Sequence, residues 1–280
     1  MVRLGRGLPG WGRAGGVQGE NERAMMLTPR VGFIWDIDGV VLDSPHEESW
    51  RLTLAQEPWN TEGLSSDFYF HHLASRPRYE CAHNILELLG VYQRLGAATE
   101  EDKEALREQY ASQKDALVKD LIARGDFRLF ADAVTLVLKA RRAAVPQAAA
   151  SSSKNASTML KIVSRERVLA EVGDDFGAMP EGDTLYSVFD LDACGVEVGD
   201  RAEILKYAAQ GLKKALGEEI GQFVVFEDAA WGVKAAKSLG YIAVGVWRLG
   251  ERGALERAGA DLVTADLKAV EVADLVRLAG

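Results

Sequence analysis

Short apolar runs alternate with helical segments along this chain, and that alternation constrains the fold more than any other feature. The runs are Val31–Asp36, Gln147–Ala150, Phe223–Phe226 and Tyr241–Val246. Each is typical of a buried strand, and helical patterns separate the later ones. Strands that alternate with helices form a parallel sheet that is covered on both faces. The sequence therefore predicts an α/β fold with a doubly wound, Rossmann-like sheet.

The chain between the first run and the second has a different pattern, which is helical throughout. Over Thr99–Arg124, apolar residues recur at spacings that place them on one helix face. These residues are Leu106, Tyr110, Leu117 and Leu121. We therefore predict an inserted α-helical cap domain over residues 46–127, with residues 31–45 and 128–280 forming the core.

The composition excludes several classes of protein. The 280 residues carry 33 Lys and Arg against 42 Asp and Glu, which gives a net charge of −9. An acidic chain lacks the basic surface that general affinity for nucleic acid or anionic membrane requires. No apolar run approaches the roughly 20 residues of a membrane-spanning helix. We therefore expect neither nucleic acid nor a membrane as a partner.

Residues 1–30 differ from the rest, because five Arg and two Glu give them a net charge of +3. They have no apolar segment of the kind that a secretory signal needs. We expect a disordered tail or an extension from an upstream start codon. The two cysteines, Cys81 and Cys194, form no CxxC pair, so a cytoplasmic location is expected.

Two carboxylates follow the first predicted strand directly, as Asp36-Ile37-Asp38-Gly39. In an open parallel sheet, binding sites form beyond the carboxyl ends of the strands, where both aspartates fall. Two close carboxylates repel each other unless a cation or a shared proton relieves them. Mg²⁺ suits this role, because it prefers carboxylate and phosphate oxygens. The alternative is an Asp-Gly turn that caps a following helix.

Two more strand ends carry polar residues. Ser151, Ser153, Lys154 and Asn155 follow the second run, where hydroxyl groups, free helix N–H groups and a Lys charge together make a phosphate cradle. A plain Ser N-cap is the alternative there. Glu227-Asp228 ends the third run. Carboxylates at two strand ends and a phosphate cradle at another indicate one metal-dependent phosphoryl-transfer site.

These motifs carry a resemblance to a known family. Phe33–Ser44 resembles the first motif of the haloacid dehalogenase superfamily, Ser151 its second motif and Glu227-Asp228 its fourth. The similarity covers nearly all of residues 31–280 and is greatest to the β-phosphoglucomutase-like group. It implies that the helical insertion is a cap that closes over the site and excludes water.

The resemblance also implies roles for the acidic residues. Asp36 would be the nucleophile that forms an aspartyl-phosphate, and Asp38 the general acid and base. Mg²⁺ would be held by Asp36, the Asp38 carbonyl and Asp228, with Glu227 nearby. These roles are chemically reasonable, because a carboxylate attacks a phosphate effectively once a metal neutralises the phosphate charge.

Several cap residues match the mutase-like pattern. Arg78 takes the place of an Arg that grips the non-reacting phosphate, and Lys114 lies in the family's cap lysine segment. His46 and Trp50 reproduce a His-x₃-Trp pair, although His46 lies two residues closer to the first motif than the family pattern expects. Lys154 and Asn155 match the group's extended second motif. For Arg78, Lys114 and His46 singly, a solvated charge or a surface His is the alternative.

The third motif departs from the family. The family places a Lys before the helix that here begins near Arg201, but no Lys occurs between Lys161 and Lys206. That Lys normally pairs with the nucleophile and the transferred phosphate. Arg201 is a candidate substitute, with Lys206 and Arg165 as other sources of charge, although Arg and Lys are not equivalent.

The functional prediction is Mg²⁺-dependent phosphoryl transfer on a small phosphorylated metabolite, such as a sugar phosphate. A phosphomutase is narrowly favoured, because the cap cations suit a second phosphate. A phosphatase of the same superfamily is the alternative, and a non-catalytic binding protein on a degenerate scaffold is a third. Asp38 argues against a dehalogenase, which does not need it. We expect a monomer or a small homo-oligomer.

Overall fold

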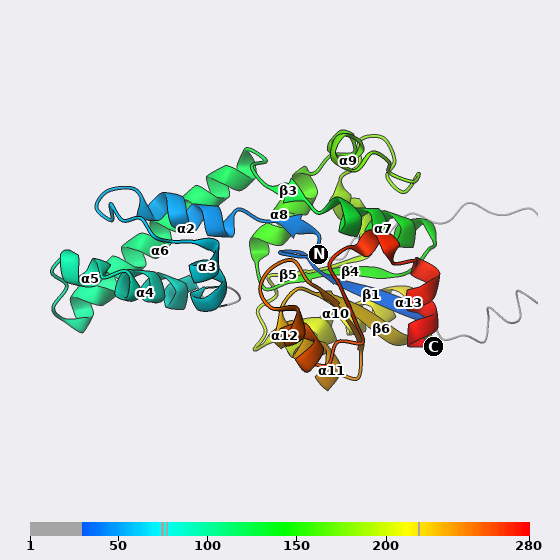
Figure 1. Cartoon of the computed structure of the whole chain (residues 1–280). Helices are drawn as coiled ribbons and strands as arrows, with labels where there is room; N and C mark the ends of the chain where they lie inside the picture. The colour runs from blue at the N-terminus through cyan, green and yellow to red at the C-terminus, as the bar shows by residue number, and fades with distance from the viewer. Residues whose placement is uncertain (1–29, 74–75, 77, 218) are drawn as a thin grey trace, which may run out of the picture.

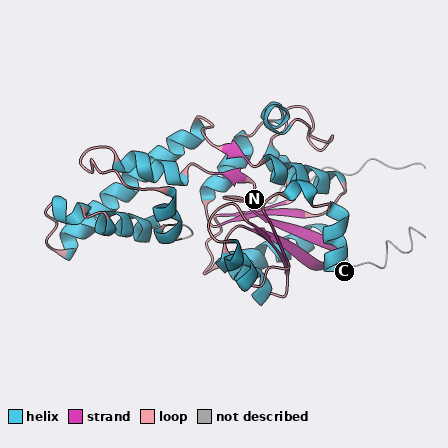
Figure 2. Ribbon diagram, viewed as in Figure 1, coloured by secondary structure: helices cyan, strands magenta, loops and turns pink. Residues whose placement is uncertain are grey.

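The computed structural model describes residues 30–73, 76, 78–217 and 219–280, so all of the predicted tail over residues 1–30 except Arg30 lies outside the described residues. Its main feature is a parallel sheet flanked by helices (Figures 1 and 2). The strand order is β5-β4-β1-β6-β7-β8. These strands are β1 Arg30–Asp36, β4 Gln147–Ser151, β5 Leu191–Cys194, β6 Ile220–Glu227, β7 Ile242–Val246 and β8 Leu262–Thr264. The predicted doubly wound sheet is confirmed.

Strand β1 lies at the centre of the sheet, between β4 and β6. Ile34 is paired with Ala148 on one side and Val225 on the other, in parallel register. The chain moves outward from β1 in both directions, so β1 lies at the point where the strand order reverses. In such sheets, ligands bind beyond the carboxyl ends of the strands at that point. The topology therefore places the ends of β1, β4 and β6 together.

Successive residues of the strands alternate between two apolar cores, one on each face of the sheet. Phe33 and Trp35 face the core that includes α7, α8 and α13, whereas Ile34 faces α10, α11 and α12. Trp35 stacks on Phe226 with ring centroids 3.7 Å apart and donates to Gln147 Oε1. The core helices are α7 Ala131–Arg142, α8 Lys154–Ile162, α9 Arg165–Val172, α10 Arg201–Leu216, α11 Ala230–Ser238, α12 Arg252–Arg257 and α13 Val272–Ala279, with short 3₁₀ turns η1 Leu185–Val188 and η2 Leu267–Ala269.

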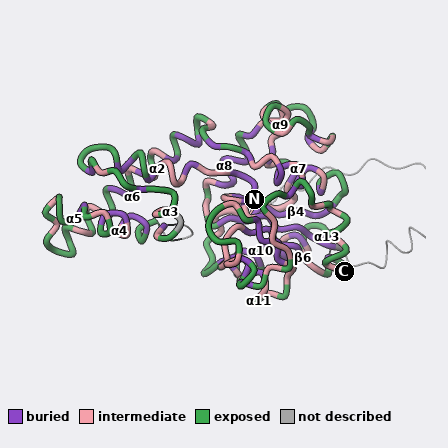
Figure 3. Tube along the Cα trace, in the orientation of Figure 1, coloured by how far each residue is buried: buried purple, intermediate pink, exposed green. Residues whose placement is uncertain are grey.

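The chain between β1 and α7 forms a separate helical body, which projects from the sheet in Figure 1. Its helices are α2 His46–Leu54, α3 Ser66–His72, α4 Arg78–Leu88, α5 Val91–Arg94 and α6 Glu100–Ala123. They enclose a core of their own, in which Trp59 and Tyr110 are completely buried, and the buried segments lie along their inner sides in Figure 3. Among the described residues, no helix combines the length and the apolar character needed to cross a membrane.

Two short strands connect this helical body to the sheet. Strand β2 (Leu42–Asp43) leads into α2, and β3 (Arg128–Leu129) leads out of α6 toward α7. The two strands run antiparallel and are paired, with Leu42 opposite Leu129 and Asp43 opposite Arg128. The chain therefore leaves and re-enters the core at a single place, next to the end of β1.

Candidate active site

A tight turn at the end of β1 carries Asp36 and Asp38. The backbone N–H groups of Val41 and Leu42 donate to the Ile37 carbonyl at 3.0 and 2.9 Å, which closes the turn. Gly39 has a φ of +85°, a left-handed conformation that favours glycine. A Cβ at Gly39 would lie 2.0 Å from Asp228 Oδ2. The turn therefore packs directly against the carboxylate at the end of β6.

Three carboxylates meet at this edge of the sheet. One oxygen from each of Asp36, Glu227 and Asp228 lies within 4.8 Å of the others. Burial raises the pKa of Asp36. Burial also raises the pKa values of Glu227 and Asp228 to about 8, and for these two groups the neighbouring carboxylates add to the effect. Clustered oxygen ligands whose charges repel suit a hard divalent cation such as Mg²⁺. The donor set therefore fits the predicted metal.

Arg201 brings a positive charge to these carboxylates from the first turn of α10. Its Nε and Nη2 lie 2.6 and 2.5 Å from Glu227 Oε1, and Nη2 lies 3.2 Å from Asp36 Oδ1. The Arg201 side chain is only 2% exposed. The structure thus brings Arg201 beside Asp36, where the family's third-motif Lys would act. A buried cation so close to the predicted nucleophile would offset charge that develops on a transferred phosphate.

The other cations considered for the third motif lie elsewhere. Arg165 is paired with Asp175, and Lys206 is exposed on α10. Glu227 keeps its place beside Arg201 partly because Gly232 leaves room for it, since a Cβ there would lie 2.2 Å from its carboxylate.

Asp38 is a buried carboxyl group, and burial makes its ionised form unfavourable. Burial, and then the Asp36 charge, raise the pKa of Asp38 to about 7, although nearby Ser44, Ser151 and Lys114 lower it. Its Oδ2 accepts a long hydrogen bond of 3.4 Å from Ser151 Oγ. Within the described residues, its Oδ1 is buried and makes no hydrogen bond of normal geometry. A group that gains and loses a proton near neutral pH suits general acid–base catalysis.

In the hydroxyl-rich turn after β4, one residue lies beside Asp38 and the others make contacts elsewhere. Ser151 is buried beside Asp38, and its Oγ also accepts from Ser153 N at 3.1 Å. Ser153 is the N-cap of α8 and its Oγ accepts from Asn155 N, so this hydroxyl makes the plain Ser N-cap of the alternative interpretation. Lys154 Nζ is bonded to Glu197 at 2.8 Å, and its side chain is 71% exposed. Lys154 would have to leave Glu197 before it could contact a phosphate.

Lys114 and His46 form a buried pair in the helical body. Lys114 Nζ lies 2.8 Å from His46 Nδ1 and 4.9 Å from the centre of the Trp50 ring. Burial, and then Arg78, lower the pKa of Lys114 to about 8, while Asp38 raises it. Burial and the neighbouring Lys114 lower the pKa of His46 to about 3, so His46 is neutral at pH 7. The pair therefore places one positive charge within reach of Asp38.

Sequence reasoning missed two residues near this pair. Asp115 lies 2.8 Å from Arg78 and 2.7 Å from Lys119, so that it holds the predicted phosphate-binding Arg in an ion pair. Tyr69, on α3, is close enough to Asp38 for the carboxylate to raise its pKa, although burial is the larger cause. Neither residue belongs to a motif. The only sequence signal for Asp115 is its position directly after Lys114.

Comparison with known proteins identifies the family. Residues 32–240 match the haloacid dehalogenase-like hydrolase family, so the chain belongs to that family and is an enzyme of the phosphatase and phosphomutase type. The resemblance noted in the sequence is confirmed.

Individual proteins agree with this assignment. The crystal structure of an archaeal β-phosphoglucomutase from Pyrococcus sp. strain ST 04 is 31% identical, covers 89% of this chain and 98% of its own, and gives a TM-score of 0.72. A β-phosphoglucomutase from Clostridium difficile, 22% identical over 88% of this chain and 95% of its own with a TM-score of 0.58, shares the fold. The 2-deoxyglucose-6-phosphate phosphatase 2 of Saccharomyces cerevisiae is 45% identical over 56 residues, which span 20% of this chain and only 23% of the yeast protein.

Proposed function

We propose that this chain transfers the phosphoryl group of a sugar phosphate through an aspartyl-phosphate on Asp36, with Mg²⁺ as cofactor. The observation that carries the proposal is the position of Arg201, which is buried between Asp36 and Glu227. A carboxylate next to a fixed cation, at the reversal point of a parallel sheet, is suited to attack phosphorus. The names of the similar proteins, which act on glucose phosphates, support a sugar phosphate as substrate.

The reaction divides between two aspartates. An Asp36 oxygen forms a bond to phosphorus as the bond between phosphorus and the sugar oxygen breaks. Asp38, protonated in a good fraction of molecules near neutral pH, donates its proton to the departing oxygen. Asp38 then takes a proton from the group that attacks the phospho-aspartate. Mg²⁺, held by Asp36, Asp228 and Glu227 with the Asp38 carbonyl, would neutralise phosphate charge.

The attacking group distinguishes two activities. A sugar hydroxyl would make the enzyme a phosphomutase, which the similarity to the archaeal β-phosphoglucomutase and the cap cations Arg78 and Lys114 support. Water would make it a phosphatase. The ion pair between Arg78 and Asp115 favours this second candidate, because it occupies the Arg that a second phosphate would need.

One incubation tests both activities. The protein is given Mg²⁺ and β-glucose 1-phosphate with a trace of glucose 1,6-bisphosphate, next to a panel of sugar monophosphates. Isomerised sugar without free phosphate would support the mutase, and free phosphate would support the phosphatase. Asp36→Asn should abolish either activity. If neither the wild type nor Asp36→Asn turned over any substrate, both proposals would fail.

We also propose a cytoplasmic location. Cys81 and Cys194 are free thiols, and Cys81 Sγ donates to the Leu73 carbonyl at 3.2 Å in the cap core. Cysteines that stay as free thiols are typical of a reducing compartment.

A further inference from the structure

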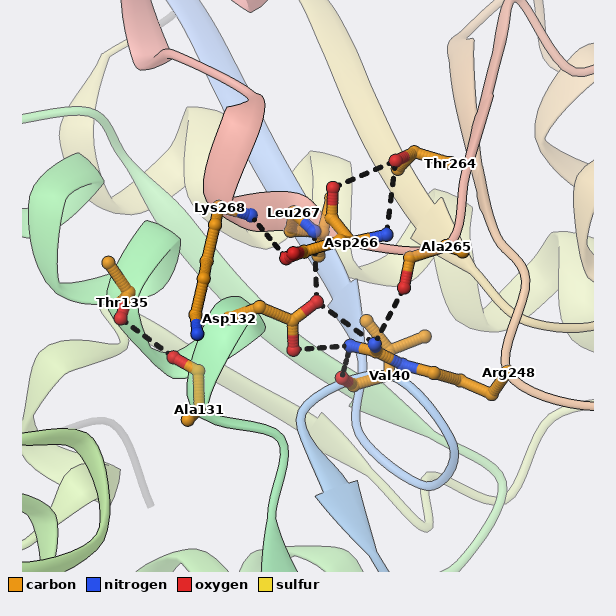
Figure 4. A network of polar contacts seen from close by, with 10 residues as sticks. All are labelled: Val40, Ala131, Asp132, Thr135, Arg248, Thr264, Ala265, Asp266, Leu267 and Lys268. Carbon is orange, nitrogen blue, oxygen red and sulfur yellow. Dashed lines mark hydrogen bonds and ion pairs between the residues drawn. The ribbon is translucent and has the colours of Figure 1, made fainter.

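A buried ion pair beyond the catalytic residues joins four separate segments of the core (Figure 4). Arg248, which follows β7, bonds both oxygens of Asp132 in α7, at 2.9 and 2.8 Å. The same guanidinium donates to the Ala265 carbonyl and to the Val40 carbonyl, each at 3.3 Å. The Cζ atom of Arg248 lies 4.2 Å from the centre of the Phe130 ring. The contact with Val40 matters most, because Val40 belongs to the turn that carries Asp38.

The ion pair is held from several sides through both terminal nitrogens of Arg248, although the buried Nε makes no hydrogen bond within the described residues. The side chains of Arg248 and Asp132 are 12% and 10% exposed. Asp132 Oδ2 also accepts from Leu267 N at 2.9 Å, and bonds from Arg248 and Leu267 keep the pKa of Asp132 below its usual range despite burial. Bidentate Arg–carboxylate pairs fix geometry as well as charge. The Val40 carbonyl is thus held by a group that has little freedom to move.

The position of Asp38 depends on its backbone. Its side chain accepts the long 3.4 Å bond from Ser151 and interacts with Ser44, and Oδ1 makes no hydrogen bond of normal geometry among the described residues. The surrounding turn is closed by bonds to the Ile37 carbonyl and by Gly39 N donating to the Leu42 carbonyl at 2.8 Å. A shift of Val40 would therefore move the carboxyl of Asp38, because both residues belong to this one turn.

The same ion pair supports the link to the helical body. Phe130 N donates to the Val41 carbonyl at 3.0 Å, so the turn is also tied to the segment that leads from β3 into α7. Asp132 lies two residues beyond Phe130. Arg248 therefore contacts the turn directly, and through Asp132 it is also connected to the segment that follows β3.

We propose that Arg248 and Asp132 are positioning residues that hold the turn of Asp38 in its catalytic geometry. This inference rests on the proposed function, in which Asp38 protonates the leaving oxygen. It predicts that loss of the ion pair slows the reaction of a sugar phosphate more than that of p-nitrophenyl phosphate. A sugar alkoxide needs a proton to leave, whereas p-nitrophenolate leaves without one, so only the sugar substrate depends on an accurately placed Asp38.

The test compares kcat/KM for the two substrates in Arg248→Gln. Small displacements of catalytic groups cost up to about 100-fold in rate, so we expect a loss of at least about 10-fold for the sugar phosphate. The loss for p-nitrophenyl phosphate should be less than about 3-fold. Arg257→Gln is the matched control, because Arg257 makes a similar pair with Glu251 on the surface and does not touch the turn. Arg257→Gln should leave kcat/KM unchanged for both substrates.

A second variant covers the case in which Arg248→Gln does not fold. Asp132→Asn keeps the shape of the side chain but loses its charge, and it should show the same selectivity with a smaller loss. Equal losses on both substrates, or no loss in either variant, would overturn the inference while the activity of the wild type left the proposed function intact. An inactive wild type would overturn the proposed function, and this inference with it.

Discussion

The cost of burying Lys114 leads to a specific prediction about stability. The Lys114 side chain is about 5% exposed, and its pKa falls from an ordinary value of 10.5 to about 8. This difference corresponds to roughly 3 kcal/mol, which the folded protein bears at neutral pH in order to keep the charge. We expect Lys114→Met to be more stable than the wild type at pH 7.

The gain should be smaller than the full penalty. Methionine loses the bond to His46 and the contact with the Trp50 ring, which together are worth about 1–2 kcal/mol. A net gain of about 1–2 kcal/mol remains. For a chain of this size, 1 kcal/mol shifts the unfolding midpoint by about 2–4 °C. The midpoint should therefore rise by about 2–8 °C.

The stability of the wild type depends on pH through Lys114. Between about pH 8 and 10.5 the unfolded chain keeps a proton on Lys114 that the folded chain has lost, so wild-type stability gains from rising pH across that window. The advantage of Lys114→Met should therefore shrink between pH 8 and 10.5. The groups whose charges act on Lys114 are Arg78, Asp115, Cys81 and Asp38, and they are the same in both proteins.

Differential scanning calorimetry at pH 7 and at pH 10 measures the difference in unfolding midpoint between Lys114→Met and the wild type. Lys119→Met is the control, because Lys119 lies on the same helix, is 64% exposed and pairs with the same Asp115. It should change the midpoint little at either pH. If Lys114→Met were less stable than the wild type at pH 7, or if its advantage did not depend on pH, the argument from charge burial would be wrong.

Substitutions at three further positions test the site. Arg201→Ala should lower kcat by about 100-fold or more, because it leaves buried carboxylates without their cation, and Arg201→Lys should restore part of the rate in the same steady-state assay. Gly39→Ala should lose both activity and stability, measured by turnover and thermal unfolding, because its Cβ would collide with the Asp228 carboxylate. Asp115→Asn should free Arg78 and strengthen binding of a sugar bisphosphate relative to the monophosphate by about 3- to 10-fold in calorimetric titration; an unchanged ratio would contradict the role given to Asp115.

The strand ends were predictable, and the contacts between distant segments were not. Asp36, Ser151 and Asp228 stand where apolar runs stop, so hydrophobic pattern and topology together bring them to one edge. Strand β8 gave no comparable signal, because its three residues are only partly buried. Arg248 carries no local signal, since its partner Asp132 lies 116 residues away and only the folded sheet brings them together.

Arg201 is an intermediate case. The missing Lys of the third motif drew attention to it, but only the structure shows that its guanidinium reaches Asp36 and Glu227 at once. Lys154 shows the opposite outcome, because its sequence context suggested a phosphate contact and its ammonium is bound to Glu197 at the surface. A long, flexible side chain leaves its direction open until its neighbours are known.

The pairing of β2 with β3 gives this protein a modular construction. Because the chain departs and returns through adjacent antiparallel strands, the two ends of the helical insertion lie side by side at Asp43 and Arg128. The insertion and the sheet also have separate apolar cores. A different insertion could be joined at the same two residues without altering a single pairing of the sheet. The three clustered carboxylates belong to the sheet and would stay in place in such an exchange, whereas the charge that Lys114 brings to Asp38 would leave with the insertion.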